Sequence, residues 1–321
     1  ALVTILILGI ASAGGISAVI DNIKEIPGFF EFFGIARPEL VDGVQQLAKD
    51  GKPLFKEAGN YGWLTIISTL SWGLGYFGIP QVLIRFMAIR KTEELSKSRR
   101  IATIWCCVSL FAAVSIGLIG RTLYPAELLT LSEGESIFVL MSTNLLPALL
   151  AGVVMAGILA ATISSSDSYL LIAASAFSKN IYQGILKKDA SDKQVMLISR
   201  VVLIIISLFG VIIALDENSI IFNVVSFAWA GFGATFGPIM LFSLFWKRTS
   251  RAGAIAGMLA GGGMVFFWKL VLKPLGGVFA IYELLPAFII SSLAIIIVSI
   301  LSKEPSKEIL EEFQLAKTVE G

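Results

Sequence analysis

Apolar runs long enough to cross a lipid bilayer recur along this chain, and they restrict its possible folds more than any other feature. The hydrocarbon core of a bilayer is about 30 Å thick, and a helix needs roughly 20 apolar residues to span it. Hydrophobic residues make up 56% of the 321 residues and charged residues only 15%, which is unusual for a soluble domain. We therefore predict an all-α integral membrane protein with about eight transmembrane helices. The expected spans are 1–19, 61–89, 101–120, 147–177, 197–215, 219–246, 252–271 and 281–302.

The connections between these spans alternate in charge. The basic connections are 90–100, 179–193 and 247–251, and the acidic or nearly uncharged ones are 121–146 and 216–219. Basic connections favour the cytoplasmic side, so we expect a multi-pass protein of the cell membrane with a cytoplasmic tail, 303–321. The polar segment 20–60 would then be an external loop with some helix of its own. A net charge of +2 says little about partners, and we expect the lipid bilayer but no nucleic acid.

Histidine is absent from the sequence, which removes the commonest metal ligand and the usual proton shuttle near neutral pH. The only cysteines, Cys106 and Cys107, are adjacent, too close for ordinary disulfide geometry. We interpret both as packing residues.

One span carries a polar cluster, "ATISSSDSYLL", at 161–171. An Asp at the centre of a membrane helix costs about 2.5–3.5 kcal/mol, so this face is expected to meet water, an ion or protein rather than lipid. Ala161, Ser164 and Ser165 are three and four positions apart and share one helix face, where a carbonyl and two hydroxyls can converge. An ion site and a helix-packing face are both open on this pattern. Asp167 faces elsewhere, and a water-filled pathway is one role for it.

Another span is interrupted by glycine and proline. The string "STLSWGLGYFGIPQVLIRFMAIR", at 68–90, contains three glycines before Pro80, so the helix is expected to bend or unwind there. Transporters use such breaks to bind solutes. Trp72 and Tyr76 are four residues apart and would form an aromatic wall beside the break, while Arg85 is a candidate for gating or for lining a pathway. The alternative is that the glycines permit close helix packing and the aromatics fill core space.

The string "SFAWAGFGATFGPIMLF", at 226–242, is again rich in glycine and contains Pro238. A bent helix packed through small residues explains it without a ligand.

Three strings, "GWLTIISTLSWGLGYFGIPQVLIRFMAIR", "AGILAATISSSDSYLLIAASAFSKNIY" and "VVSFAWAGFGATFGPIMLFSLFWKRTSRAGAIAGM", resemble the sodium:solute symporter family. The resemblance runs from about residue 1 to residue 302. It implies a five-plus-five inverted-repeat fold of which this chain lacks most of the first repeat. The implied parts are a last helix of the first repeat at 1–19, the loop 20–60, the second repeat at 61–246, two trailing helices at 252–302 and the tail.

The resemblance also implies functional residues. Na⁺ would be held by the carbonyl of Ala161 and the hydroxyls of Ser164 and Ser165, and its other ligands would lie on an absent helix. Trp72, Tyr76 and Pro80 would bind the solute, for which proline is the expected substrate. The role of Gln81 stays open.

The implied activity is Na⁺-coupled symport by alternating access, without covalent chemistry or catalytic residues. Two other functions are open: symport of another small amino acid or carboxylate, and a symporter-like sensory module in the membrane. The 321 residues on their own could also be inactive, because half of each site would be absent.

Overall fold

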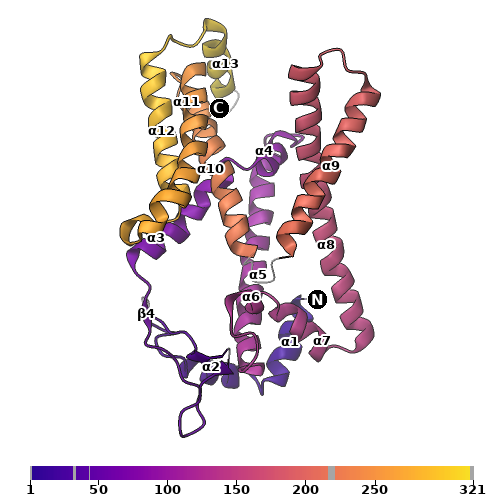
Figure 1. The fold of residues 1–321 in the computed structure, drawn as a ribbon, viewed down its shortest axis with the longest axis vertical. Coiled ribbons are helices and arrows are strands. Elements are labelled where there is room, and N and C mark those ends of the chain that lie inside the picture. Colours follow the sequence, from indigo (N-terminus) through magenta and orange to yellow (C-terminus); the bar gives the residue numbers. More distant parts are fainter. Residues whose placement is uncertain (1, 32–33, 43, 216–220, 319–321) are drawn as a thin grey trace. The chain divides into compact units, whose positions relative to one another are not determined.

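Long helices dominate the computed structural model, which describes residues 2–31, 34–42, 44–215 and 221–318 (Figure 1). Six helical segments in these ranges are long and apolar enough to cross a membrane. They are α5 (Glu94–Leu123), α8 (Ala148–Ser175) with its π-helical continuation to Leu186, α9 (Asp192–Ala214), α10 (Ile221–Phe245), α11 (Arg251–Phe267) with its extension to Leu275, and α12 (Leu284–Leu301). The prediction of a helical membrane protein is confirmed, whereas the predicted count of about eight spans is not.

The first difference lies at 1–19, where we expected one helix. The structure has α1 (Leu2–Ser12) and α2 (Ile16–Lys24), and the two axes differ by 76°. Gly14 and Gly15 separate them with φ angles of 86° and 103°, which a right-handed helix cannot contain. The helix expected at 1–19 is therefore divided in the structure, and the pair makes a seventh candidate span if it is counted as one broken span.

The helix at 61–89 is interrupted, as the sequence predicted. The segment 61–89 is divided into α3 (Trp63–Ser71), the 3₁₀ helix η1 (Trp72–Phe77) and α4 (Pro80–Met87). Pro80 occupies the first turn of α4, where its missing N–H costs nothing. The predicted interruption of this helix is confirmed.

The segment 20–60 contains the end of α2, as some helix was expected there, and also short strands. Strand β1 (Gly34–Ile35) pairs antiparallel with β4 (Gly59–Asn60), and β2 (Leu40–Val41) pairs antiparallel with β3 (Val44–Gln45). The "VDGV" sequence that joins β2 to β3 is a typical hairpin sequence, and Asp42 has the positive φ, 52°, that such turns require. Beyond the end of α2 at Lys24, the described part of this loop is built from turns and these short strands.

The remaining α-helices of the described chain are α6 (Leu131–Gly134), α7 (Ile137–Leu145) and α13 (Lys307–Thr318), and the 3₁₀ helix η5 (Gly277–Ala280) lies between α11 and α12. Helix α6 begins with a capping box, in which the Thr130 hydroxyl accepts from the Glu133 N–H and the Glu133 carboxylate accepts from the Thr130 N–H. Hydrogen bonds from Thr130 lower the pKa of Glu133. The acidic connection expected at 216–219 lies outside the described residues.

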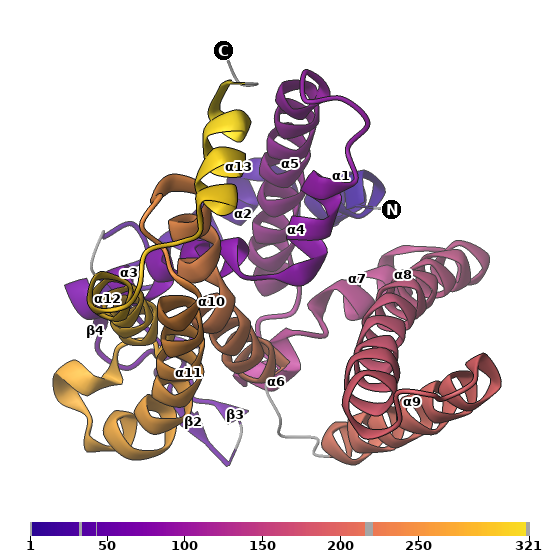
Figure 2. The same ribbon diagram turned by 90° about the horizontal axis from the view of Figure 1, so that it is seen from above.

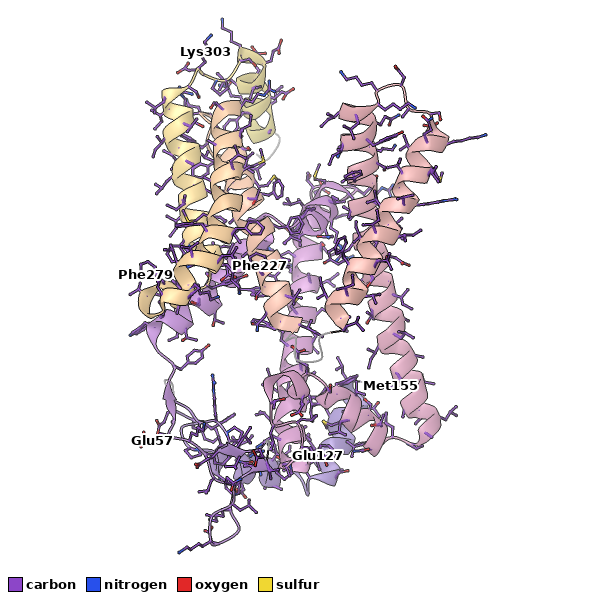
Figure 3. All side chains as sticks on the ribbon, in the orientation of Figure 1. Glu57, Glu127, Met155, Phe227, Phe279 and Lys303 are labelled. Carbon is purple, nitrogen blue, oxygen red and sulfur yellow. The ribbon has the colours of Figure 1, made fainter. Side chains whose placement is uncertain are left out.

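The chain divides into two compact units, each with its own core. Unit 1 comprises Ala1–Glu25, Pro38–Leu54 and Val108–Ile220. Its core gathers apolar side chains of α1, α2, α5, α7 and α8, among them the fully buried Ile5 and Met141. In the most apolar stretch of α8 only 6% of the residues are buried, and in that of α9 none are. The side chains of both helices stand outward (Figure 3). Apolar faces of this extent are expected to contact lipid or other protein.

Unit 2 comprises Ile26–Arg37, Phe55–Cys107 and Ile221–Gly321. Its core lies between α10, α11, α12 and η1, and the first three helices run side by side in both ribbon views (Figure 2). Glycines at 253, 257 and 261 bring α11 against its neighbours, because a Cβ at any of them would overlap atoms of α10 or α12. The Ser291 hydroxyl donates to the carbonyl of Gly257 at 2.8 Å, which joins α12 to α11. Helix α10 runs unbroken through Pro238.

Candidate functional site

Trp72 lies at the centre of an aromatic cluster in unit 2. Its ring stacks on Phe222 and on Trp229 at 5.3 Å between centroids, with interplanar angles of 15° in both cases. The ring of Tyr282 lies 6.0 Å from that of Trp72 at 17°. Tyr76 meets Trp229 edge to face at 4.8 Å. The two predicted wall residues, Trp72 and Tyr76, are thus joined by contacts to the same indole of α10.

The backbone at the break explains how these rings approach one another. The Trp229 indole N–H donates to the Trp72 carbonyl at 3.0 Å, which ties α10 to the start of the 3₁₀ segment. A Cβ at Gly75 would overlap the Trp229 indole, and a Cβ at Gly233 would lie 2.7 Å from the Gly75 Cα. The glycines of both strings therefore serve one close contact between η1 and α10. The string at 226–242 was predicted to pack closely through its small residues, and the contact of Gly233 with Gly75 agrees with that prediction.

Trp229→Phe tests this tie. The substitution keeps an aromatic ring but removes the N–H donor, so we expect it to lower the free energy of unfolding by about 1 kcal/mol. Thermal unfolding of the detergent-purified protein measures the change. Trp105→Phe is the matched control, because Trp105 is 67% exposed on α5 and its replacement should cost less than about 0.5 kcal/mol. Equal effects of the two substitutions would show that the hydrogen bond does not stabilise the break.

A cavity of about 490 Å³ opens beside this cluster. Its lining comprises Ser68, Thr69, Trp72, Phe222, Asn223, Ser226, Lys269, Lys273, Ala280 and Tyr282. Of the three predicted solute residues, Trp72 lines it, whereas Tyr76 and Pro80 are not among its lining residues. Pro80 and Gln81 are half-buried at the start of α4, and Arg85 is exposed farther along that helix.

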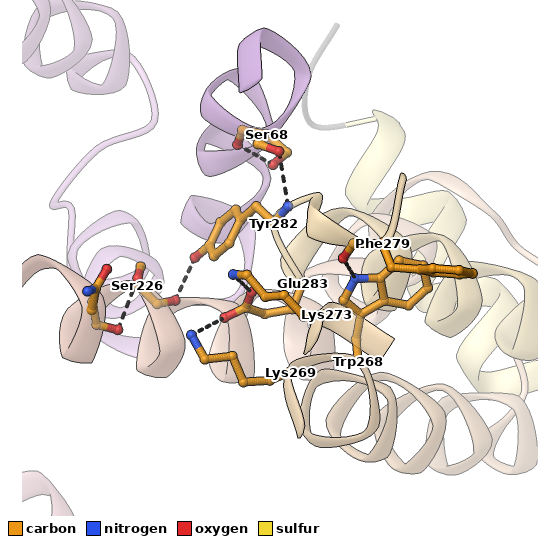
Figure 4. Close-up of polar contacts among 10 residues, drawn as sticks. Ser68, Ser226, Trp268, Lys269, Lys273, Phe279, Tyr282 and Glu283 are labelled. Carbon is orange, nitrogen blue, oxygen red and sulfur yellow. Dashed lines mark hydrogen bonds and ion pairs between the residues drawn. The ribbon is translucent and has the colours of Figure 1, made fainter. Parts of the chain in front are cut away.

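Tyr282 is fixed in the cavity wall by two hydrogen bonds (Figure 4). Its backbone N–H donates to the Ser68 hydroxyl at 3.0 Å, and its own hydroxyl donates to the Ser226 carbonyl at 2.6 Å. Burial, and then the charge of Glu283, raises the pKa of the Tyr282 hydroxyl above its usual value. Tyr282 therefore remains a protonated donor throughout the physiological pH range.

The polar cluster of α8 belongs to unit 1. Ala161, Ser164 and Ser165 lie on an uninterrupted stretch of α8, and all three are exposed. The neighbouring hydroxyls of Thr162 and Ser168 donate to carbonyls one turn earlier, those of Ile158 and Ser164, at 3.0 and 3.1 Å. Thr162 and Ser168 thus satisfy their hydroxyl groups within their own helix, as polar residues in membrane helices often do without any function.

Ser164 and Ser165 differ from these neighbours. Their hydroxyls make no hydrogen bond with any residue that the structure describes, so their oxygens are available to a ligand. Asp167 is also exposed, and it forms no ion pair within the described ranges. Neutral hydroxyl and carbonyl oxygens are suitable ligands for a hard monovalent cation, and the available oxygens of this face fit part of such a coordination shell.

Comparison with known proteins identifies the family. The model described as "Sodium:solute symporter family" matches residues 1–261, most of the chain. This chain belongs to the sodium:solute symporter family. The chain is 40% identical over 273 residues to the sodium/proline symporter of Haemophilus influenzae, an alignment that covers 84% of this chain and 54% of that protein.

Two further relatives of this symporter-family chain are similar to the same degree. The high-affinity proline transporter PutP of Bacillus subtilis is 38% identical over 272 residues, which is 85% of this chain and 57% of the relative. A sodium/proline symporter of Staphylococcus aureus is 39% identical over 249 residues, which is 76% of this chain and 49% of the relative. The chain thus spans about half the length of the curated relatives it matches.

Sequence reasoning missed Phe222, Trp229 and Tyr282, which complete the aromatic cluster around Trp72. The only available signal was for Trp229, which lies among small residues in the string "SFAWAGFG". That string predicted close packing, but not the partner against which it packs.

Proposed function

We propose that this chain forms part of a secondary transporter that couples the uptake of L-proline to the entry of Na⁺. The observation that carries the proposal is the 38–40% identity to relatives whose names specify proline transport or sodium/proline symport. The family membership supports a transporter rather than an enzyme, with Na⁺ as the coupling ion.

For the solute site we propose Trp72, Tyr76 and Pro80. The aromatic faces beside the break would pack against the pyrrolidine ring, while non-helical backbone near Gly78 and Ile79 would meet the charged groups of the amino acid. Gln81, which follows Pro80 and is half-buried, would add a polar side chain to this site.

For Na⁺ we propose the carbonyl of Ala161 and the hydroxyls of Ser164 and Ser165, with further ligands from other parts of the complete transporter. Binding of Na⁺ would stabilise an outward-open arrangement and complete the solute site, so that solute moves uphill as Na⁺ moves down its gradient. Asp167 and Arg85 would line the pathway. The inverted-repeat assignment, with 61–246 as the second repeat, and a cytoplasmic carboxyl terminus belong to the same proposal.

Uptake of radiolabelled L-proline tests the function. The protein encoded by the complete reading frame that contains residues 1–321 is reconstituted in liposomes, with an inward Na⁺ gradient or with choline in place of Na⁺. We expect accumulation only with the Na⁺ gradient, and its collapse when an ionophore dissipates that gradient. Accumulation that is equal in choline would contradict Na⁺ coupling. Preferential accumulation of another small carboxylate would change the substrate, and proline binding without net uptake would favour a sensory module.

A further inference from the structure

A cavity at one end of unit 2 combines basic and apolar residues, and neither proposed site uses it. Its volume is about 540 Å³, and its lining residues come from 249–255 and 302–309. Three candidate spans end here, because α10 ends at Phe245, α11 begins at Arg251 and α12 ends at Leu301. Figure 3 labels Lys303 just beyond the end of α12. The ends of membrane helices lie at the level of the lipid headgroups, so the cavity is expected at that level.

Hydrogen bonds hold the ends of these spans together at the cavity. The Arg248 guanidinium donates through Nη2 to the carbonyls of Ile300 and Ser302, at 3.3 and 2.8 Å, and so caps the end of α12. The Ser250 hydroxyl caps α11 by accepting from the Gly253 N–H at 3.0 Å, and it lies 2.6 Å from the Ser302 hydroxyl. These contacts fix the wall of the cavity and engage both serine hydroxyls within the protein.

The charged residues around the cavity leave a surplus of positive charge. Arg251 and Lys303 both line it, both are exposed, and neither forms an ion pair within the described residues. Glu304 also lines it, but the Nε of Arg248 lies 3.8 Å from the Glu304 carboxylate. Three positive charges and one negative charge sum to +2, and Arg248 already offsets Glu304. The charges of Arg251 and Lys303 are therefore available to an anion, and both side chains are suitable donors to a phosphate group.

The rest of the cavity wall is apolar, and it continues along the outer face of α11. Ile255 and Ile309 line the cavity and are 44% and 55% exposed. Leu259 follows Ile255 by one helical turn and is 71% exposed, so an apolar strip leads from the cavity along α11. A soluble phosphate compound would leave this strip uncovered, whereas the acyl chain of a lipid would pack against it.

We propose that Arg251 and Lys303 bind the phosphate group of an anionic phospholipid, with one of its acyl chains against Ile255 and Leu259. Basic pockets between membrane helices recognise anionic headgroups in this way. A volume of about 540 Å³ lies within the range of about 300–1,000 Å³ that small-molecule sites occupy. Because Ile309 belongs to α13, the bound lipid would contact α11 and α13 together. The proposal requires neither the solute nor the coupling ion proposed above.

Photo-crosslinking tests the site without requiring transport. The protein encoded by the complete reading frame is purified in detergent with phosphatidylglycerol that carries a photoactivatable group in its acyl chain, and mass spectrometry identifies the labelled peptides. We expect labelling in the peptide that contains Ile255 and Leu259. Unlabelled phosphatidylglycerol should suppress it at about tenfold lower concentration than phosphatidylcholine, whose headgroup has no net charge. Equal suppression by the two lipids, or labelling only on other helices, would overturn the site.

Substitution of the two cations tests their role. Each basic residue near anionic lipid contributes a roughly fivefold preference, so Arg251→Gln with Lys303→Gln should raise the concentration of phosphatidylglycerol for half-maximal labelling about thirtyfold. Arg251→Lys with Lys303→Arg keeps both charges and should stay within about threefold of the parent.

Lys187→Gln with Lys188→Gln is the matched control, because both lysines are exposed in a basic connection of unit 1 and the same charge is removed. Labelling of α11 should not change in this control. An equal loss there would show a general attraction of the basic protein to anionic lipid and would overturn the site. Competition between the two unlabelled lipids on the unmodified protein decides the question if a variant fails to fold.

Inorganic phosphate separates the two sources of a phosphate group. The lipid gains from its acyl chains as well as its headgroup, so phosphate should displace the labelled lipid only at about a hundredfold higher concentration or more. Displacement by phosphate at the concentration that suffices for phosphatidylglycerol would assign Arg251 and Lys303 to a soluble phosphate compound and would overturn the lipid site.

Discussion

Replacing Ser164 and Ser165 together with Ala is expected to raise the Na⁺ concentration that half-saturates proline uptake by about a hundredfold or more. A hydrogen bond or similar polar contact to a charged group contributes about 1.5–3 kcal/mol, and 1.4 kcal/mol corresponds to a tenfold change in affinity. Both hydroxyls are exposed on α8 and make no hydrogen bond within the described residues, so their loss should affect a bound ion more than the helix itself.

Ser168→Ala is the control for this experiment. Ser168 lies on the same helix, and its hydroxyl is already used in a 3.1 Å bond to the carbonyl of Ser164. We expect Ser168→Ala to leave the Na⁺ requirement within about threefold of the parent, the scale of a single exposed hydroxyl. The measurement is the initial rate of radiolabelled proline uptake against Na⁺ concentration. An unchanged requirement in the double variant, or an equal shift in the control, would return the cluster to helix packing.

The fold was predictable where the sequence signal is local. Hydrophobic length predicted the long helices of the membrane protein, and Pro80 with its preceding glycines predicted the break between α3 and α4. The 76° turn at Gly14 and Gly15 was missed, because the apolar run continues across it and hydropathy does not register backbone angles. Strands β2 and β3 were missed because two-residue strands are too short for a periodic pattern.

The candidate sites were predictable only in part. The face of Ala161, Ser164 and Ser165 follows from helical spacing alone. In contrast, the contacts of Trp72 with Trp229 and Tyr282 join positions 157 and 210 residues apart, and periodicity within one segment does not contain that information.

The ion pairs of Lys269 and Lys273 with Glu283 show the same limit. Lys269 and Lys273 have the i, i+4 spacing of one helix face, which sequence reasoning could have noted. Their partner Glu283 lies beyond a turn at two glycines with positive φ, and the folding of that connection determines the contact.

Gly78→Ala is expected to destabilise the helix break, because the added methyl group would overlap backbone atoms. A Cβ at Gly78 would overlap the carbonyl oxygen of Phe232 and lie 2.7 Å from the amide nitrogen of Gly237. Both are backbone atoms of α10, which no rotamer change can move, so we expect a loss of about 1–3 kcal/mol in the free energy of unfolding. Gly78 itself has φ −111°, which Ala adopts without strain, so the effect is purely one of space.

Gly73→Ala is the matched control, since Gly73 belongs to the same 3₁₀ segment and a Cβ there meets nothing within 4 Å. It should change stability by less than about 0.5 kcal/mol. Thermal unfolding in detergent, followed by proline uptake in liposomes, compares the two variants. If Gly78→Ala unfolds at the same temperature as Gly73→Ala and transports as well, α10 yields to the added methyl group, and the contact that holds the break against α10 is adjustable rather than rigid. A lower unfolding temperature in Gly78→Ala alone would instead show that this contact is rigid and that it fixes the positions of Trp72 and Tyr76 beside the break.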